Sequence, residues 1–558
     1  MLKRFEQAIF KSLQSKNKKR LILFITFLAF VFSMMLIPSQ LVLAKMLPGK
    51  NSNTFNVYLD LPSGSSIYQT SQVSECITGL LQKEKEVKNI EVFLGMGGPL
   101  DFAGLLKGSQ FKHLENLAEM VVNLSGKHHR TEPSYLMVQR LRPIITSQCE
   151  ALYAGTSIKF VQPPAGPPVL ASIVAEVYGD NAQGIRTLAL KIEKVFKGTK
   201  GLVDIDIMQD DIYDSFEIRV NSIKIARSGL SVKQVNEVLY IAFEGMEIGV
   251  KNSDVYDEQI PIFLSLSAKS KVFTNKSKEA IKAKLSSLKL MNKKGMMVPL
   301  TEVISLVATK SNPMILAKNL KQMTNVLAQT DMVSQVYPLM AARNTIINEF
   351  SKEYEIKKIG LFNLELTHKQ SQKIYRLIWD GEMEVTLDTF VELGMAFCAA
   401  LVLIFLLMVL YYKSFKLSAI ILFGSFLSII GVIFGHYIMD VFTKDTFFLT
   451  ATSLIGFIAL IGISSRNTLL LLDFTKSLIF NKNIPQTQAI AQATATRAKP
   501  IFLTAVAIIL ASTLLASDAV FGGLGVSLIF GTIAAVIASL VVIPVLMDNI
   551  DLHEAFNK

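Results

Sequence analysis

Residues 450–474 read TATSLIGFIALIGISSRNTLLLLDF, and this stretch decides how the rest of the chain is interpreted. It is apolar and long enough to cross a bilayer, which takes about 20 helical residues. Arg466 and Asn467 nevertheless lie well inside it. Placing a guanidinium in hydrocarbon costs free energy and usually serves a function. The stretch therefore predicts a membrane helix that carries a functional polar group.

The composition supports membrane spans joined to a sizeable soluble region. Apolar residues make up 51% of the chain and charged residues 18%, a mixture untypical of an ordinary soluble protein. The formal charge is +12, but many basic residues lie in residues 1–20, immediately before an apolar run. That arrangement is a positive-inside flank of a membrane helix. No nucleic-acid-binding motif accompanies the charge, so nucleic acid is not an expected partner.

Six apolar runs are long enough to span a bilayer. The first is interpreted as an uncleaved span, because its apolar core is longer than that of a signal peptide and no A-x-A site follows. The basic residues predict that residues 1–20, 474–499 and 548–558 are cytoplasmic and that residues 45–385 lie outside. Trp379, just before the second span, is expected to be an interfacial anchor. The predicted spans are residues 21–44, 386–412, 417–439, 447–473, 500–518 and 521–547.

The large region between the first two spans reads as mixed α/β. Alternating apolar residues predict a strand over 55–61, followed by a helix over 68–84 and a strand over 90–94. The same order returns over 171–208. We therefore expect two related subdomains of split βαβ type. They would cover residues 45–160 and 161–385 and meet at a proline-rich linker, with an insertion at about 215–290 in the second.

The cysteines and histidines give no sign of catalysis. Cys76 and Cys149 would both face an oxidising compartment, where a disulfide can form, but the sequence favours two buried free thiols. The pair His128-His129 lacks neighbouring ligands and reads as solvated loop. The chain carries no P-loop, nucleophile elbow or HExxH motif. An enzyme is not expected, nor is a cofactor or a metal site.

The candidate site is therefore the polar part of the fourth span. Arg466 stays protonated at any physiological pH, so it cannot itself load and release a proton. It can serve as a fixed counter-charge for a carboxylate, or else snorkel to the interface. Thr504, in the fifth span, is a further relay candidate, although a hydroxyl bonded to its own helix is more common. The acidic residues close to the spans all lie near span ends: Glu392, Asp440, Asp473 and Asp518. A titrating acid would have to come from elsewhere.

The order of one span, a large α/β region and five spans resembles the carboxy-terminal half of the resistance–nodulation–division (RND) efflux permeases. The matching stretches lie at the span ends, in the fourth span and in the soluble region. They are Trp379-Asp380-Gly381-Glu382, Ser414-Phe415, Thr450-Ala-Thr-Ser, Ile463-Ser-Ser-Arg466-Asn467, Arg497-Ala-Lys-Pro500-Ile-Phe-Leu-Thr504, Val542-Ile-Pro544, Val336-Tyr337 and Ala226-Arg-Ser-Gly229-Leu230-Ser231.

The resemblance implies a bacterial inner-membrane transporter without cofactors. Its periplasmic region would form two porter subdomains with a docking insertion. The resemblance also implies a trimer, a periplasmic adaptor protein, an outer-membrane channel and conformational cycling driven by inward proton flow. Arg466, followed by Asn467, falls where many members have a relay lysine, and Thr504 matches the relay threonine of the next span.

Length is the main departure, because family members usually contain two homologous halves. The paired relay aspartates belong to the amino-terminal half, which this sequence does not contain, in agreement with its lack of a mid-span acid. We therefore expect one subunit of a split permease; alternatives are the remnant of a broken gene and a non-transporting scaffold. Hydrophobic or drug-like cargo is favoured over metal ions or lipid, since core filling accounts for most methionines. The methionines considered as metal ligands are Met96, Met291, Met296 and Met297.

Overall fold

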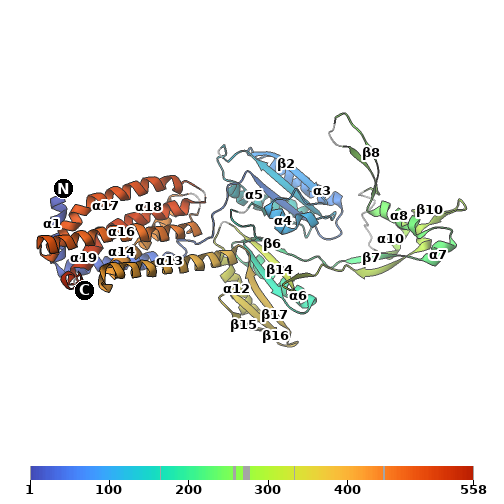
Figure 1. Ribbon diagram of the computed structural model, residues 1–558. Helices are drawn as coiled ribbons and strands as arrows, with labels where there is room; N and C mark the ends of the chain where they lie inside the picture. The colour runs from blue at the N-terminus through green and yellow to red at the C-terminus, as the bar shows by residue number, and fades with distance from the viewer. Residues whose placement is uncertain are drawn as a thin grey trace. The chain divides into compact units, whose positions relative to one another are not determined.

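The computed structural model describes residues 2–127, 129–163, 165–255, 259–267, 277–331, 333–443, 446–518 and 520–556. The chain divides into two compact units (Figure 1). One unit comprises residues 1–51, 164–206 and 325–558, and so holds the membrane bundle and one α/β lobe. The other comprises residues 52–163 and 207–324.

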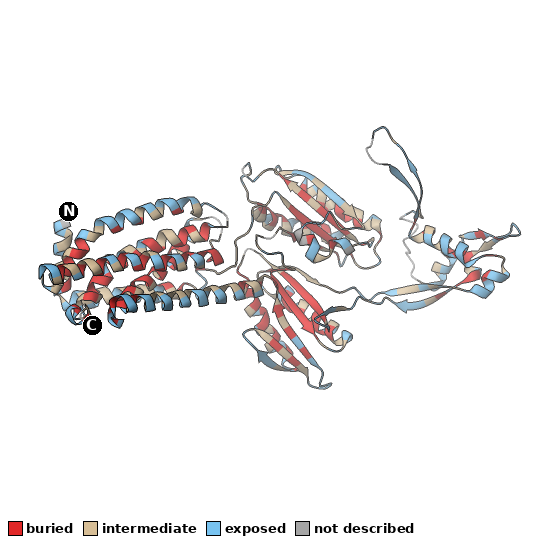
Figure 2. Cartoon of the chain, viewed as in Figure 1, coloured by how far each residue is buried: buried red, intermediate tan, exposed pale blue. Residues whose placement is uncertain are grey.

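Long apolar helices form the bundle. Five segments among the described residues are long and apolar enough to cross a membrane: Glu382–Tyr412, Phe415–Phe442, Ala451–Lys482, Gln486–Ala516 and Gly522–Asp548. The helices that build them are α13 (Glu382–Tyr412), α14 (Phe415–Phe426), α15 (Ser428–Phe442), α16 (Ala451–Lys482), α17 (Gln486–Ala516), α18 (Gly522–Ile537), the π-turn η3 (Ala538–Val542) and α19 (Ile543–Asp548). Figure 2 shows α13 and α17 exposed along most of their length, whereas about half of the residues in the apolar segments of α16 and α18 are buried.

The first predicted span is shorter in the structure than in the sequence analysis. Helix α2 (Lys16–Met35) starts at the cap Ser15 and ends at Met35, not near residue 44. Pro38 disfavours a helical residue before it, and Gln40 has a φ of 63°, so the chain turns. Ala44 then pairs with Leu449 in an isolated bridge. Because the start of α2 is strongly basic, α2 is not among the five long apolar helices, and the count of six spans stays a prediction.

The loop predicted over residues 474–499 is helical instead. Helix α16 runs on to Lys482 and α17 starts at Gln486, so only Asn483–Pro485 connects them. Asn483 adopts a left-handed conformation with a φ of 52°, which ends α16. The alanine-rich residues 486–498 favour helix strongly. Hydropathy alone therefore placed the end of α16 too early and the start of α17 too late, because both helices extend beyond their apolar segments.

The first α/β lobe contains a four-stranded antiparallel sheet in the order β2-β3-β1-β4. Phe55, Val57 and Leu59 alternate along β1 and are fully buried, in one core with residues of α3 and α5. The intervening residues point to the other sheet face, as the two-residue period requires. The elements are β1 (Thr54–Asp60), α3 (Ile67–Leu81), β2 (Val87–Leu94), α4 (Phe102–Lys107), β3 (Leu117–Leu124), α5 (Ser134–Cys149) and β4 (Ser157–Val161).

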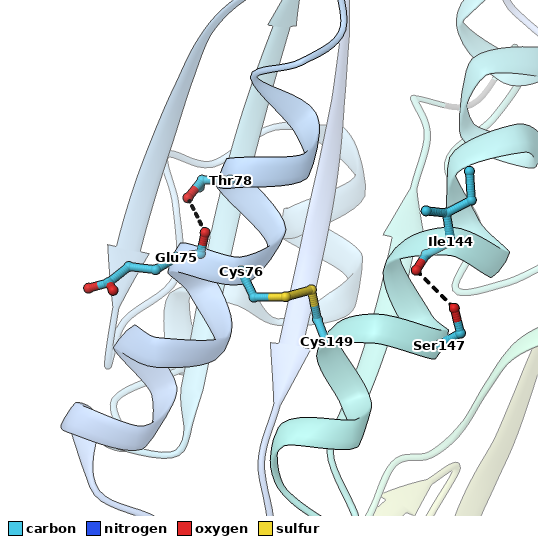
Figure 3. Close-up of a disulfide and its surroundings, with 6 residues drawn as sticks. All are labelled: Glu75, Cys76, Thr78, Ile144, Ser147 and Cys149. Carbon is cyan, nitrogen blue, oxygen red and sulfur yellow. Dashed lines mark hydrogen bonds between the residues drawn. A yellow bond between two sulfur atoms is a disulfide. The ribbon is translucent and has the colours of Figure 1, made fainter.

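A disulfide in this lobe corrects the expectation of free thiols. Cys76 of α3 and Cys149 at the end of α5 are bonded, with Cα atoms 5.8 Å apart (Figure 3). The two residues are separated by 73 positions, so no local spacing signalled the pair. They meet because both helices pack into the same core, where Cys149 is fully buried. Disulfides persist in oxidising compartments.

The second α/β lobe is built on a sheet in the order β13-β14-β5-β17-β16-β15, with β6 also paired to β14. Trp379, expected at a membrane interface, is a core residue of β17. Its indole N–H donates to the carbonyl of Phe362, and its ring stacks on Phe196. The elements are β5 (Ile173–Tyr178), α6 (Ala182–Gly198), β6 (Leu202–Ile207), β14 (Lys321–Thr330), α12 (Val336–Phe350), β15 (Tyr354–Ile359), β16 (Asn363–His368) and β17 (Ile374–Asp380).

The insertion between β6 and β14 is longer than the predicted 215–290. Strand β7 (Asp214–Val220) pairs with β12 (Ile304–Lys310), and α8 (Val232–Phe243) follows Ser231, whose hydroxyl caps the helix. Its remaining elements are α7 (Ser222–Arg227), β8 (Met246–Lys251), β9 (Ile260–Leu264), α10 (Lys278–Leu285), β10 (Lys289–Met291), β11 (Met297–Pro299), α11 (Leu300–Val303) and β13 (Leu316–Lys318).

Candidate functional site

Arg466 lies on an exposed stripe of α16. It is 15 residues beyond the start of that helix, about 22 Å at ~1.5 Å per residue. The exposed residues recur every three or four positions and so share one helical face. Two of them are small, which leaves room for another helix to approach closely. The stripe consists of Ile455, Ala459, Gly462, Arg466 and Leu470.

The Arg466 guanidinium forms no hydrogen bond or ion pair with any residue that the structure describes. A Cβ added at Gly462, one turn before it, would meet nothing within 4 Å. An arginine at the centre of a membrane helix costs about 3 kcal/mol on insertion scales. The bundle of this chain therefore presents a positive charge on an open face and does not neutralise it.

The other two predicted site residues are not joined to Arg466 by any hydrogen bond. Asn467 is only 4% exposed and so points into the bundle, whereas Arg466 points out of it. Thr504 is exposed on α17, and its hydroxyl lies 3.1 Å from the carbonyl of Pro500 and 2.9 Å from that of Ile501. Thr504 thus bonds to its own helix, which is the common behaviour of a membrane threonine.

Three of the four acidic residues at the span ends have local partners, whereas Glu392 is exposed and forms no hydrogen bond or ion pair with any described residue. Asp473 accepts a hydrogen bond of 2.7 Å from the hydroxyl of Tyr412. Asp440 accepts one of 2.7 Å from the backbone N–H of Phe447. Asp518 accepts from the backbone N–H groups of Val520 and Phe521. None of these carboxylates forms an ion pair with Arg466.

A second polar cluster in the bundle, around His436 of α15, escaped the sequence analysis. His436 is fully buried, and its Nδ1 lies 2.8 Å from the carbonyl oxygen of Val432. Its Nε2 lies 2.8 Å from the hydroxyl of Ser453 in the first turn of α16. A histidine inside the predicted span 417–439 was the available signal, because ionisable residues are rare in membrane helices. The sequence analysis considered the histidine pair at residues 128–129 and overlooked His436. His128 lies outside the described residues.

Hydrogen bonds tie the second α/β lobe to the bundle. The hydroxyl of Ser334, just before α12, donates to the carbonyl of Ala44. The hydroxyl of Tyr337 donates to the carbonyl of Ile37 at 3.1 Å. Gly381 joins β17 to α13 with a φ of 88°, and a Cβ there would lie 2.5 Å from the carbonyl of Ala171. Only glycine fits this junction without a shift of the backbone, so the sheet and α13 are closely coupled.

The first α/β lobe carries a polar sheet face opposite its core. Asn56 donates to the carboxylate of Asp101 at 3.2 Å, and Glu119 is fully buried and accepts from the N–H of Gly98 at 3.1 Å. Burial alone would raise the pKa of Asp60, but the ammonium of Lys159 bonded to it holds that pKa below its usual value. Within the lobe, this face offers hydrogen bonds and charge of both signs.

Potential metal ligands do not gather anywhere in the described part of the chain, where no group of three or more His, Cys, Asp or Glu side chains could hold an ion. Met291 pairs with Met297 across the hairpin of β10 and β11, and both are exposed, as is Met296 between them. Met96 lies in the first α/β lobe, away from these three in the chain. Three of the four methionines therefore share one exposed hairpin of the insertion.

Comparison with known proteins identifies the family. A profile of the AcrB/AcrD/AcrF family matches residues 1–550. The swarming motility protein SwrC of Bacillus subtilis is 24% identical over 383 residues, which are 67% of this chain and 32% of that protein. Protein HelA of Legionella pneumophila is 22% identical over 79% of this chain and 39% of its own length. The cobalt-zinc-cadmium resistance protein CzcA of Cupriavidus metallidurans is 21% identical over 60% of this chain and 29% of that protein.

A solved structure shows the same fold. The crystal structure of a heavy metal efflux pump superimposes with a TM-score of 0.71 and 19% sequence identity, and it covers 99% of this chain. The match takes in only 52% of that pump, and the curated relatives are matched over 29–39% of their lengths. Because the family profile extends over nearly the whole chain, the chain belongs to the AcrB/AcrD/AcrF family of RND efflux permeases.

Proposed function

We propose that this chain is one half of a proton-driven efflux permease and works with a second chain that supplies the titrating carboxylates. The observation that carries the proposal is the exposed guanidinium of Arg466, which has no partner in the described part of the bundle. The solved pump is about twice as long as the part of it that this chain matches, since the match takes in 52% of that pump. The second chain would cover the exposed stripe of α16.

The chemistry of arginine assigns its role in such a pair. The guanidinium keeps its charge, so it stabilises a neighbouring carboxylate while that group is ionised and loses the attraction once the group is protonated. Protonation of the partner acid would therefore release the contact between the two bundles. Each turnover would alternate between an ion-paired and a released arrangement of α16.

The coupling to the soluble region would run through the hydrogen bonds and the tight junction at Gly381 described above. A shift of α13 or of residues 36–44 changes the bonds to Ser334 and Tyr337, which lie at the start of α12. The second α/β lobe would then move with the bundle and open or close a cargo site. In the proposed topology both lobes lie in the periplasm and the termini in the cytoplasm, and the Cys76–Cys149 disulfide fits the oxidising side.

Hydrophobic or drug-like molecules are the proposed cargo, exported with a periplasmic adaptor, an outer-membrane channel and a trimeric arrangement of the completed pump. The lack of a group of three or more His, Cys, Asp or Glu ligands among the described residues supports organic cargo. Divalent metal ions are the second candidate, favoured by relatives named for cobalt, zinc, cadmium and nickel resistance. A non-transporting scaffold is less well supported, since it does not need an open arginine in mid-span. Lipid is the remaining alternative cargo and would leave the role of Arg466 unchanged.

Gly462→Leu tests the partner surface. A leucine there fills the open stripe beside Arg466, and a Cβ at this position meets nothing in the chain itself, so the chain should fold and its partner should be lost. The measurement is the membrane protein recovered with a tagged chain from native membranes in mild detergent. We expect recovery to fall at least about tenfold, which corresponds to ~1.4 kcal/mol.

Gly394→Leu is the matched control, because Gly394 of α13 is also exposed and a Cβ there also meets nothing within 4 Å. It should leave recovery unchanged. Equal recovery from both variants, or no partner even with the unsubstituted chain, would contradict the proposed half-permease. Cargo is then read from the same cells, as accumulation of ethidium compared with sensitivity to Co²⁺, Zn²⁺ and Cd²⁺ after deletion of the gene.

A further inference from the structure

We propose that His436 is a proton-binding group of the bundle, loaded through a chain of hydroxyl groups that starts at Thr452. The chain of contacts lies at the lobe end of the bundle, where α2 and α15 finish and α13 and α16 begin. The inference concerns protonation of the chain itself, so it can succeed or fail independently of the proposed partner and cargo.

Four side chains from two helices form an unbroken series of short contacts. The hydroxyl of Thr452 lies 2.8 Å from that of Thr450, which lies 3.1 Å from that of Ser453. Ser453 in turn lies 2.8 Å from Nε2 of His436. Thr452 also lies 3.1 Å from the carbonyl of Val520. Each hydroxyl can donate or accept, so the series can carry a proton in either sense.

Burial increases along the series, from 7% exposure at Thr452 through 3% at Thr450 to 0% at Ser453 and His436. Its entrance is at Val520, which is half-buried and lies two residues beyond the exposed Asp518. Thr452 is therefore the least buried of the four residues. A proton can reach His436 along this series without water entering the packed core.

The protonation step balances within these groups. Because Nδ1 faces the carbonyl of Val432, it carries the hydrogen in the neutral ring and Nε2 is the acceptor. A hydronium ion at Thr452 gives up one proton, each hydroxyl passes its own proton to the next, and Nε2 receives the last one. The products are water and an imidazolium whose Nε2–H donates to Ser453. All three hydroxyls then point outward, and Thr452 donates to Val520.

The surroundings of His436 favour release of its proton as well as uptake. The charged residues on α15 and on the elements packed against it are few, and none forms a hydrogen bond or ion pair with His436. An imidazolium at this position is held by the carbonyl of Val432 and the hydroxyl of Ser453, which stabilise it less than a carboxylate would. Those charged residues are Asp440 on α15, Lys45 after α2, Lys416 on α14, Asp518 before α18, the basic residues at the start of α2, and Arg466, Asp473, Lys476 and Lys482 on α16; α18 itself has none.

Gly523 of α18 packs against the side of the hydroxyl series. A Cβ at this glycine would lie 2.4 Å from the hydroxyl oxygens of both Thr450 and Ser453. The backbone of α18 thus packs directly against the hydroxyls and keeps them aligned. Further along the same face of α16, Leu460 packs against Gly531, so the polar series stops at His436 and an apolar contact separates it from the rest of the bundle.

The test measures histidine protonation in the full chain, labelled with 15N-histidine and reconstituted in lipid nanodiscs. Subtracting the spectrum of His436→Gln isolates the ring of interest from the other histidines. Near pH 8 we expect the neutral tautomer protonated at Nδ1, and lowering the pH stepwise to about 3 should convert it to imidazolium, because burial disfavours the charged ring. A ring that stays neutral at about pH 3 would overturn the proposal, and the tautomer can be read in the unsubstituted chain even if His436→Gln folds poorly.

The route is tested by the rate of that conversion after a rapid pH drop, followed by infrared absorption of the imidazole. Thr452→Val removes the first hydroxyl at constant shape and should slow protonation about tenfold, as expected for one lost hydrogen-bond step. Thr452→Ser should restore the rate. Thr468→Val removes a buried hydroxyl elsewhere on α16 and should leave it unchanged. Equal rates in Thr452→Val and the unsubstituted chain would make His436 a structural residue.

Discussion

The lobe end of the bundle and the middle of α16 both place polar side chains in a membrane helix, but only one of them satisfies those side chains within this chain. His436 has hydrogen-bond partners at both ring nitrogens, and the hydroxyls beside it bond to one another. Arg466 has none in the described part and faces outward. The polar side chains of the first region are therefore satisfied within this chain, whereas the guanidinium of the second region needs a partner on another surface.

Removing the charge in the open region should have the largest effect. We expect Arg466→Ala to lower efflux by about a hundredfold or more, because a relay acid would lose its only fixed counter-charge. Efflux of the identified cargo from whole cells is the measurement. Arg466→Lys keeps the charge and should retain part of the activity. Undiminished efflux in Arg466→Ala, with the chain assembled, would show that the arginine takes no part in the mechanism. The second region, like the first, would then need no partner chain.

Crowding the closed region should have an intermediate effect on stability. Gly523→Ala places a methyl group 2.4 Å from two hydroxyl oxygens, so the lobe end of the bundle must shift, at a cost of about 2 kcal/mol. The thermal unfolding midpoint of the detergent-solubilised chain should fall. Gly462→Ala, on the open stripe where a Cβ meets nothing, is the control and should leave the midpoint unchanged. An equal midpoint for both variants would mean that the hydroxyls are not held by α18.

The smallest effect is expected at Thr504, which belongs to neither region in the structure. Its hydroxyl bonds only to carbonyls of its own helix, so Thr504→Val should lower efflux by at most about fivefold, the equivalent of ~1 kcal/mol. Thr504→Ser should restore full efflux. A loss as complete as that in Arg466→Ala would show that the hydroxyl leaves its helix during the cycle and joins the open region.

Hydropathy and charge predicted the positions of the long helices well but not their ends. The segment at residues 474–499 is polar, and polar residues in helices look like loop when only hydropathy is considered; its alanine content was the better guide. Trp379 was misplaced for the opposite reason, because its proximity to a span outweighed the strand alternation that buries it in β17.

The site was predictable only in part. Arg466 stood out because a charge in an apolar run is conspicuous. The absence of a mid-span acid in the sequence followed from the positions of the Asp and Glu residues, which lie near the ends of the predicted spans. The cluster at His436 depends on contacts between α15 and α16 that are 17 residues apart, and no spacing rule connects them. Likewise the Cys76–Cys149 bond depends on two helices packing in one core, which requires the tertiary fold.

That disulfide also bears on how the protein is made. In the proposed topology the residues that follow α2 are translocated in the order of their synthesis, and Cys149 emerges while residues 382–548, which form the five long apolar helices, are still to be inserted. The first α/β lobe can thus close its covalent cross-link before the bundle exists. Its biogenesis would require an oxidising folding compartment and thiol-oxidising machinery, whereas the helices synthesised afterwards depend on membrane insertion and on assembly with their partner.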